Sequence, residues 1–152
     1  MNERIQRCTE LAESPVWDRE CRPWPPGVVG AEWQQVRRPF RQILASSVVN
    51  NQWPIYLHGI QGCGKTSAAA CMYRSFVGTA RWILLEEFVR QIMRCRQDGR
   101  VEIYSPVTGE SFWRTESQWM RLVSQAQLLC IDDIGLRQPT EAAYEVVFNL
   151  IN

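Results

Sequence analysis

The sequence has very little histidine and lysine, and it lacks long apolar runs and closely spaced cysteine pairs. Its 152 residues include one histidine, His58, and one lysine, Lys65, while the other 16 of the 17 basic residues are arginines. None of the six cysteines forms a Cys-x-x-Cys pair, which argues against a structural zinc site. No apolar run approaches the roughly 20 residues that cross a bilayer, and no secretion signal begins the chain. We therefore expect a reduced, cytoplasmic protein with no membrane segment.

An excess of charge of either sign is also absent. The formal net charge is +1, so the chain as a whole gives no argument for nucleic-acid binding. Hydrophobic residues make up 45% of the sequence, which predicts a packed globular domain. The length suffices for one such domain and is too short for two full ones.

Strand-like and helix-like patterns alternate along most of the chain. We expect residues 1–32 to form an irregular arm, because prolines and glycines interrupt any long helix there, and residues 33–152 to form one core. The expected elements are a helix over 33–49 interrupted at Pro39, a buried strand over 53–58, a helix over 65–76, a strand over 81–85, a helix over 86–97, a hairpin within 98–114, a short helix opened by a capping box at Thr115 and Gln118, a buried strand over 128–131 and a helix over 140–151. This order predicts an α/β fold with a parallel sheet and helices on both of its faces.

A glycine-rich loop between a predicted strand and a predicted helix carries the strongest chemical signal. Residues 59–66 read Gly-Ile-Gln-Gly-Cys-Gly-Lys-Thr and match the P-loop pattern G-x-x-x-x-G-K-[ST] in full. Glycines let backbone N–H groups turn toward phosphate oxygens, Lys65 reaches the β- and γ-phosphates, and the Thr66 hydroxyl is a ligand for Mg²⁺. The predicted nucleotide-binding residues are Gly59, Ile60, Gln61, Gly62, Cys63, Gly64, Lys65, Thr66 and Ser67. The chain's single lysine thus stands where a compact ammonium has to fit between phosphate oxygens.

The second motif is an apolar strand that ends in two aspartates. Residues 128–133 read Leu-Leu-Cys-Ile-Asp-Asp, which is typical of a Walker B strand. Asp132 is predicted to hold Mg²⁺ through water, and Asp133 is predicted to act with Lys65 in catalysis by orienting and polarising the attacking water. A turn or a helix cap is the alternative interpretation of the two aspartates. The presence of the P-loop favours the Mg²⁺ site.

These motifs together resemble the AAA+ ATPases of the DnaC-type helicase loaders and the IstB-type transposition helpers. The resemblance extends over about residues 40–152 and includes the P-loop, the sequence Asp-Asp-Ile-Gly at 132–135 and the final helix ending Asn-Leu-Ile-Asn. It implies a P-loop NTPase fold, ATP and Mg²⁺ as cofactors, and ATP-dependent remodelling of a DNA-bound partner. That partner would be a replicative helicase or a transposase, and homo-oligomers would close the active site between subunits.

The sequence departs from that family where it ends. In the family, the helix that matches residues 140–151 is followed by the strand carrying the sensor residue, and then by the arginine finger and a helical lid. The expected sheet is therefore incomplete at the C-terminus and lacks the central strand that lies between the P-loop strand and the Walker B strand in the family. Two strands would then be left with unpaired N–H and C=O groups, which is costly, so we expect the chain to be a fragment, a truncated gene product or one piece of a split protein. Two further functions remain open, namely a nucleotide-binding fragment that switches conformation without hydrolysis and a P-loop small-molecule kinase.

Four arginines in and after the predicted helix over 86–97 leave another alternative open. They are Arg90, Arg94, Arg96 and Arg100. They would form a basic face for single-stranded DNA if the resemblance extends to that partner. The simpler interpretation, which we favour, is a solvated helix face opposite the apolar residues.

Overall fold

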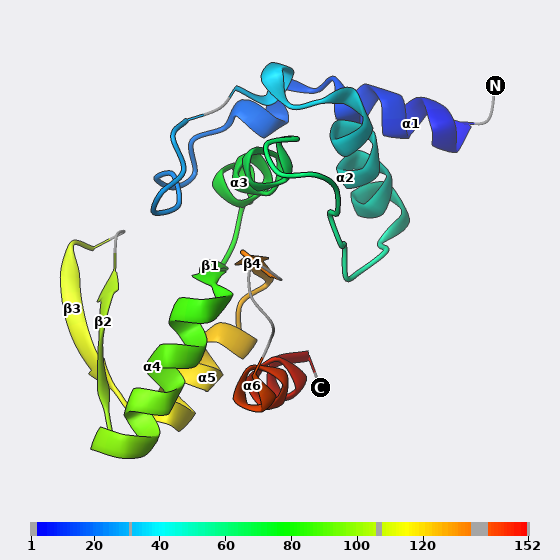
Figure 1. Cartoon of the computed structure of the whole chain (residues 1–152). Coiled ribbons are helices and arrows are strands. Elements are labelled where there is room, and N and C mark those ends of the chain that lie inside the picture. The colour runs from blue at the N-terminus through cyan, green and yellow to red at the C-terminus, as the bar shows by residue number, and fades with distance from the viewer. Residues whose placement is uncertain (1–2, 31, 106–107, 135–139, 152) are drawn as a thin grey trace. The chain divides into compact units, whose positions relative to one another are not determined.

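The computed structural model describes residues 3–30, 32–105, 108–134 and 140–151, which fall into two compact units. Unit 1 is Met1–Val77 and unit 2 is Gly78–Asn152, so the boundary lies inside the predicted 33–152 core. Unit 1 contains α1 (Glu3–Ala12), the 3₁₀ helices η1 (Pro15–Asp18) and η2 (Trp33–Gln35), α2 (Arg38–Asn50) and α3 (Lys65–Ser75) (Figure 1). Unit 2 contains β1 (Ala80–Leu84), α4 (Leu85–Asp98), β2 (Val101–Ser105), β3 (Glu110–Arg114), α5 (Glu116–Ser124), β4 (Leu128–Asp132) and α6 (Glu141–Ile151).

The N-terminal segment of unit 1 is largely helical. Residues 3–12 form α1 and residues 15–18 form η1, so the prediction of an irregular arm over 1–32 is wrong for these residues. The prolines that suggested an irregular arm begin only after α1 has ended. Pro15 occupies the first turn of η1, where a missing N–H leaves no helical hydrogen bond unmade.

Two buried indole rings hold this segment to the rest of unit 1. Trp17 and Trp33 stack with ring centroids 4.5 Å apart and planes 17° apart. Trp17 Nε1 donates to the Leu11 carbonyl and Trp33 Nε1 donates to the Ala12 carbonyl, each at 2.7 Å. The last carbonyls of a helix have no partner inside it, so these indoles close the C-terminal end of α1.

Helix α2 begins later than the prediction for residues 33–49. Trp33–Gln35 forms η2 and the α-helix begins at Arg38, so Pro39 stands in its first turn and does not interrupt it. Proline is tolerated there because the first-turn N–H groups have no partner within a helix. The helix ends at Asn50, and Asn51 takes the left-handed conformation with φ 51°.

The predicted strand over 53–58 is wrong. Among the described residues, these positions pair with no other strand, and Trp53 and Tyr56 are exposed instead of buried. A run of strand-forming residues becomes a strand only when another strand accepts its hydrogen bonds. The described part of unit 1 contains no strand, and the segment is extended coil leading into the glycine-rich loop.

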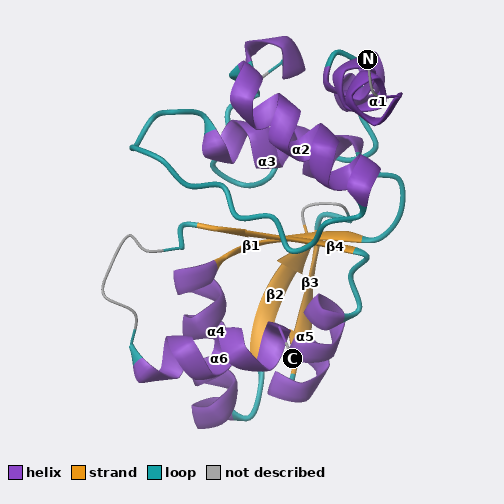
Figure 2. Ribbon diagram, turned by 90° about the vertical axis from the view of Figure 1, so that its right-hand side faces the viewer, coloured by secondary structure: helices purple, strands orange, loops and turns teal. Residues whose placement is uncertain are grey.

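Unit 2 contains the parallel pairing that the sequence predicts. Strands β1 and β4 pair in parallel from Ala80 opposite Leu128 to Leu84 opposite Asp132, which confirms the α/β class with a small parallel sheet. The predicted hairpin is also confirmed, since β2 and β3 pair antiparallel from Val101 opposite Arg114. Helices α4, α5 and α6 lie on one side of the β1–β4 pair (Figure 2).

The core of unit 2 lies between this pair and the three helices. Its buried members are Ile83, Phe88, Ile92, Trp119, Val123 and Val146. The Phe88 and Trp119 rings meet at 5.6 Å with a tilt of 58°, a favourable aromatic arrangement. The predicted capping box is present at the start of α5, where Thr115 and Gln118 each accept a hydrogen bond from the other's backbone N–H. The helix that supplies Trp119 therefore begins where the sequence indicates.

A helix that crosses a bilayer needs roughly 20 predominantly apolar residues. No helix in the described part of the chain is both long enough and apolar enough to do so.

Candidate phosphate-binding loop and acidic strand end

The glycine-rich loop of unit 1 uses backbone conformations that only glycine adopts readily. Gly59, Gly62 and Gly64 have φ values of 148°, 75° and 94°. Side-chain-bearing L-residues are strained at such angles. Gly59 is constrained a second time, because a Cβ atom there would lie 3.0 Å from Sγ of Cys63. The three glycines of the motif therefore stand at positions where the loop backbone has a positive φ.

The loop leads directly into the N-terminus of α3. Gly64 is the N-cap residue and Lys65 is the first helical residue. As a glycine, Gly64 has no side chain that could accept a hydrogen bond from the first-turn N–H groups. The positive end of the helix dipole and the first-turn N–H groups favour an anion at such a position. The predicted helix over 65–76 is thus confirmed within one residue, and its start coincides with the end of the loop.

Lys65 Nζ lies inside the curve of this loop. It donates to the carbonyl oxygens of Gly59 at 3.0 Å and Ile60 at 2.9 Å, and it lies 3.6 Å from Sγ of Cys63. Cys63 is buried, and its N–H donates to the Ile60 carbonyl at 3.3 Å. The ammonium is therefore held as a point charge against the loop backbone.

Helix α3 is fixed by its buried face. Ala68 and Ala70 are fully buried, and Met72 and Tyr73 are also in the core of unit 1. The helix packs against η1 and α2. Because one side of α3 is packed and its first turn carries the loop, the loop stands on a rigid support.

Asp132 and Asp133 lie at the carboxyl end of β4 in unit 2. Asp132 is the last residue of the strand and is half-buried, and Asp133 follows it in the left-handed conformation with φ 60°. Aspartate tolerates this conformation better than most residues. In open α/β sheets, ligands bind outside the carboxyl ends of the strands, so both carboxylates are at the expected edge.

A third carboxylate near this strand end was missed in the sequence analysis. Glu86 stands in the first turn of α4, directly after β1, whose last residue Leu84 is opposite Asp132. The pKa of Asp133 is raised above its ordinary value, first by burial and then by the negative charges of Asp132 and Glu86. The parallel register of β1 and β4 is the signal that could have predicted Glu86.

The predicted site residues thus form two groups, one in each unit. The loop residues, Lys65 and the start of α3 come together in unit 1, and the two aspartates come together with Glu86 in unit 2. Within the described ranges, no group of three or more histidine, cysteine, aspartate or glutamate side chains could by itself hold a metal ion.

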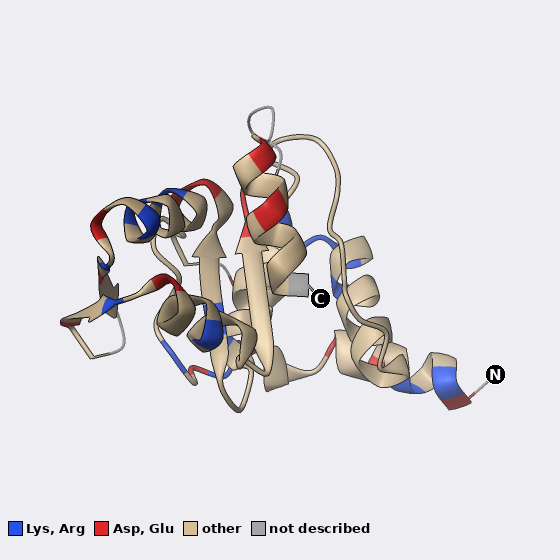
Figure 3. Cartoon of the chain, turned by 90° about the horizontal axis from the view of Figure 1, so that it is seen from below, with Lys and Arg blue, Asp and Glu red and all other residues tan. Residues whose placement is uncertain are grey.

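The four arginines considered for single-stranded DNA have different surroundings. Lys and Arg positions are blue and Asp and Glu positions are red along the ribbon in Figure 3. Arg96 forms ion pairs with Glu116 at 2.8 Å and Glu145 at 3.0 Å. The Arg100 guanidinium lies 4.9 Å from the centroid of the Trp113 ring. Arg96 therefore links α4, α5 and α6 and is not part of a free basic face.

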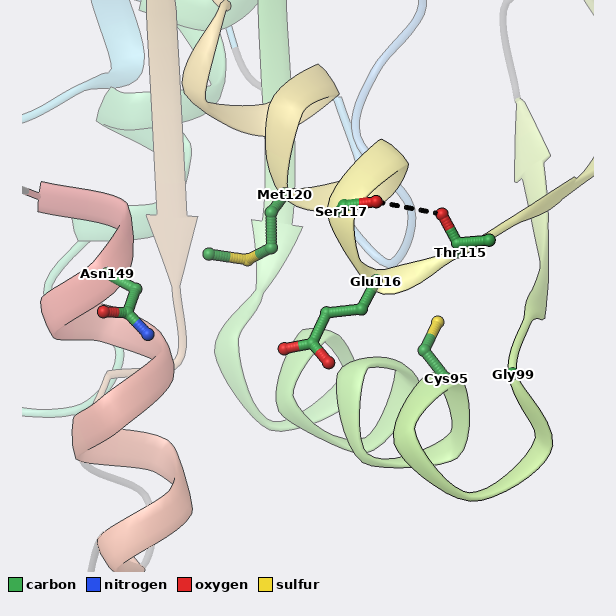
Figure 4. Close-up of a pocket in the computed structure, with 7 residues that line it drawn as sticks. All are labelled: Cys95, Gly99, Thr115, Glu116, Ser117, Met120 and Asn149. Carbon is green, nitrogen blue, oxygen red and sulfur yellow. Dashed lines mark hydrogen bonds between the residues drawn. The ribbon is translucent and has the colours of Figure 1, made fainter.

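Unit 2 also has an open depression of about 490 Å³. It is lined by Cys95, Gly99, Thr115, Glu116, Ser117, Met120 and Asn149 (Figure 4). The Thr115 and Ser117 hydroxyls bond each other at 3.2 Å, and the Glu116 carboxylate is paired with Arg96. None of the predicted site residues lines this depression.

Comparisons with protein-family models, with curated proteins and with solved structures found no match for this chain.

Proposed function

We propose that the chain binds ATP with Mg²⁺ through the loop Gly59–Thr66. The observation that carries the proposal is the position of Lys65 Nζ, 3.0 and 2.9 Å from two loop carbonyls, at the start of a helix whose N-cap is glycine. The ammonium and the helix N-terminus are two anion-attracting features at one place, and a P-loop adds backbone N–H groups that turn toward the phosphates. The phosphates of a nucleotide are the anions that such an arrangement fits.

The metal roles in this proposal come from the sequence motifs. Thr66 and Asp132 are the proposed Mg²⁺ ligands, and Asp133 is the proposed group that orients the attacking water. The half-buried position of Asp132 at the carboxyl end of β4 supports its role. The raised pKa of Asp133 is in the direction that a proton-accepting carboxylate requires.

We further propose an AAA+-type ATPase that remodels a DNA-bound partner such as a replicative helicase or a transposase. The support is the order of the two motifs along the chain, together with the parallel pairing of β1 with the aspartate-bearing β4. A P-loop kinase and a nucleotide switch without turnover predict the same binding. The three functions differ in the fate of the γ-phosphate.

The test is an equilibrium titration of the whole chain with a fluorescent ATP analogue, with and without Mg²⁺. We expect Lys65→Ala to weaken binding by tenfold or more, on the order of a lost charge-assisted contact, and Asp132→Ala to remove the Mg²⁺ dependence. Arg19→Ala, which removes one exposed cation elsewhere in unit 1, is the matched control. Equal affinity of Lys65→Ala and the unchanged protein would sink the site assignment.

Phosphate release then separates the functions. Turnover that DNA or a partner stimulates supports the remodelling ATPase. Binding without release identifies the switch, and phosphoryl transfer to a small molecule identifies the kinase.

A further inference from the structure

The C-terminal end of α3 is closed by residues from the N-terminal segment. Arg22 Nη1 donates to the Tyr73 carbonyl. The Cys21 N–H donates to the Arg74 carbonyl at 3.1 Å, and Cys21 Sγ donates to the Ser75 carbonyl at 3.5 Å. These are the last three carbonyls of the helix, which an α-helix leaves without internal partners.

Side chains reinforce the same contact. Arg74 forms an ion pair with Glu20, and its guanidinium lies 4.5 Å from the centroid of the Trp24 ring. The Arg22 guanidinium lies 5.1 Å from the centroid of the Tyr73 ring. A cation at the C-terminus of a helix also interacts favourably with the helix dipole. The segment therefore binds this helix end through hydrogen bonds, an ion pair and two cation–π contacts.

Helix α3 does not end in the way that α2 does. After α2, Asn51 turns left-handed, and its N–H donates to the carbonyls of Ser47 and Val48. After α3, Phe76 is extended with φ −67° and ψ 126°, so the chain leaves the helix without closing its last three carbonyls locally. Phe76 N–H closes the Met72 carbonyl, as Asn51 N–H closes that of Ser47. The next carbonyl is closed by Asn51 in α2 but in α3, at Tyr73, by Arg22 from 51 positions away in sequence.

The other end of α3 carries the candidate phosphate loop. The helix has 11 residues, and at about 1.5 Å per residue it is a rod of roughly 16 Å. Its buried face packs against η1 and α2. A rigid rod that is released at one end can tilt, and a tilt displaces the loop at the opposite end.

We propose that Arg22 is a positioning residue for the phosphate-binding loop and acts through α3. Its guanidinium holds the C-terminal end of the helix, so that the Gly64 N–H and the first turn keep one orientation toward the bound phosphates. This inference rests on the proposed nucleotide binding, and its test has a second readout that needs no nucleotide.

The first readout is nucleotide affinity at a temperature where all variants are folded. We expect Arg22→Ala to weaken binding of the fluorescent ATP analogue several-fold, because the apparent affinity falls with the fraction of molecules whose helix keeps the binding orientation. Arg22→Lys keeps a cationic donor and should recover most of the affinity. Arg19→Ala, a guanidinium removed three residues earlier, should bind as the unchanged protein does.

The second readout is the rate at which iodoacetamide alkylates Cys63, measured by peptide mass spectrometry without nucleotide. Cys63 is buried inside the loop, so its exposure reports displacement of the loop. We expect a several-fold faster reaction in Arg22→Ala. Val36→Ala weakens the core of unit 1 at a site that is remote in sequence from the C-terminal end of α3. The alkylation rates of Arg22→Ala and Val36→Ala are compared under conditions in which the two variants have the same unfolding midpoint.

The outcomes separate this inference from the proposed function. Unchanged affinity and unchanged Cys63 reactivity in Arg22→Ala would overturn the inference while leaving the Lys65 test intact. Equal Cys63 rates in Arg22→Ala and Val36→Ala would also overturn it, because the contact would then stabilise the unit without positioning the loop. If the unchanged protein fails to bind ATP, the proposed function fails, and the alkylation rates alone decide whether Arg22 positions the loop.

Discussion

Trp17 and Trp33 stack face to face with their ring centroids 4.5 Å apart, and each donates its indole N–H to one of the last carbonyls of α1. Trp33 is 0% exposed and Trp17 is 6% exposed. Their stacking joins two short 3₁₀ helices to α1. The N-terminal third of unit 1 therefore depends on a pair of rings for its packing.

Replacement of Trp33 by alanine should destabilise unit 1 severely. Loss of a fully buried tryptophan costs about 3–5 kcal/mol, and the Ala12 carbonyl loses its donor as well. Trp33→Phe keeps most of the apolar volume and should cost about 1–3 kcal/mol, mainly through the unpaired carbonyl. Urea unfolding followed by fluorescence measures both variants, and Val29→Ala at a site that is 92% exposed is the neutral control. A Trp33→Ala variant as stable as Val29→Ala would show that the stacking contributes nothing.

Replacement of Gly64 by alanine should weaken phosphate binding more than it weakens folding. At φ 94° an alanine is strained by about 1–2 kcal/mol, although no atom obstructs its Cβ. Gly99 is a matched control, since it has φ 77° and equally open space but caps α4 in unit 2. We expect similar losses of stability in calorimetry and a loss of ATP affinity only in Gly64→Ala. Equal affinities in both variants would argue against the loop as the binding site.

The Arg96 network should contribute stability that depends on pH and salt. Its hydrogen bond and charge lower the pKa of Glu145 below the ordinary value of 4.5. A carboxyl group whose pKa is lowered on folding stabilises the folded state at pH values above its ordinary pKa. This stabilisation is lost as the pH falls through the lowered pKa. Arg96→Ala should therefore be slightly less stable than the unchanged protein at pH 7, since an exposed charge network contributes little. This difference in stability should shrink at pH 3 and in 1 M salt. Chemical denaturation at both pH values measures it, and a difference that stays constant would contradict the prediction.

Native cysteine labelling should distinguish buried from exposed thiols. Burial, and then the negative charge of Asp18, raises the pKa of Cys71 from 9.0 to about 11, against a smaller opposite effect of Arg74. Because the thiolate is the reactive form, Cys71 should react far more slowly at pH 8 than the exposed Cys21. The same shift should make unit 1 lose stability as pH rises from 9 toward 11, since the unfolded chain ionises first. Peptide mass mapping after brief alkylation checks the first expectation, and comparable rates at Cys21 and Cys71 would contradict it.

Helices and strands were predicted correctly from the sequence where a local pattern is enough to determine their hydrogen-bonding partners. The helix at Lys65 and the hairpin at Val101–Arg114 follow from periodicity and turn residues, and both are present. The strand over 53–58 was wrong because its pairing partner is not encoded within the segment. Helix α1 was missed because its end is completed by indoles from Trp17 and Trp33, which no local pattern reveals.

The candidate site shows the same division. The glycine conformations at positions 62 and 64 could be predicted from the motif, because the loop has to curl around an anion. Glu86 could have been predicted only from the register of β1 against β4, and Arg22 only from a contact between distant segments, and neither follows from a local pattern.

The register of β1 against β4 also has a consequence for the order of folding. Ala80 pairs with Leu128, 48 positions further along the chain, whereas Ser105 and Glu110 in the hairpin are separated by four residues. Closing a long segment costs more entropy than closing a short one, and non-local pairing slows folding. The hairpin is therefore free to form within about 1–10 μs, before the sheet that brings the two aspartates to their strand end.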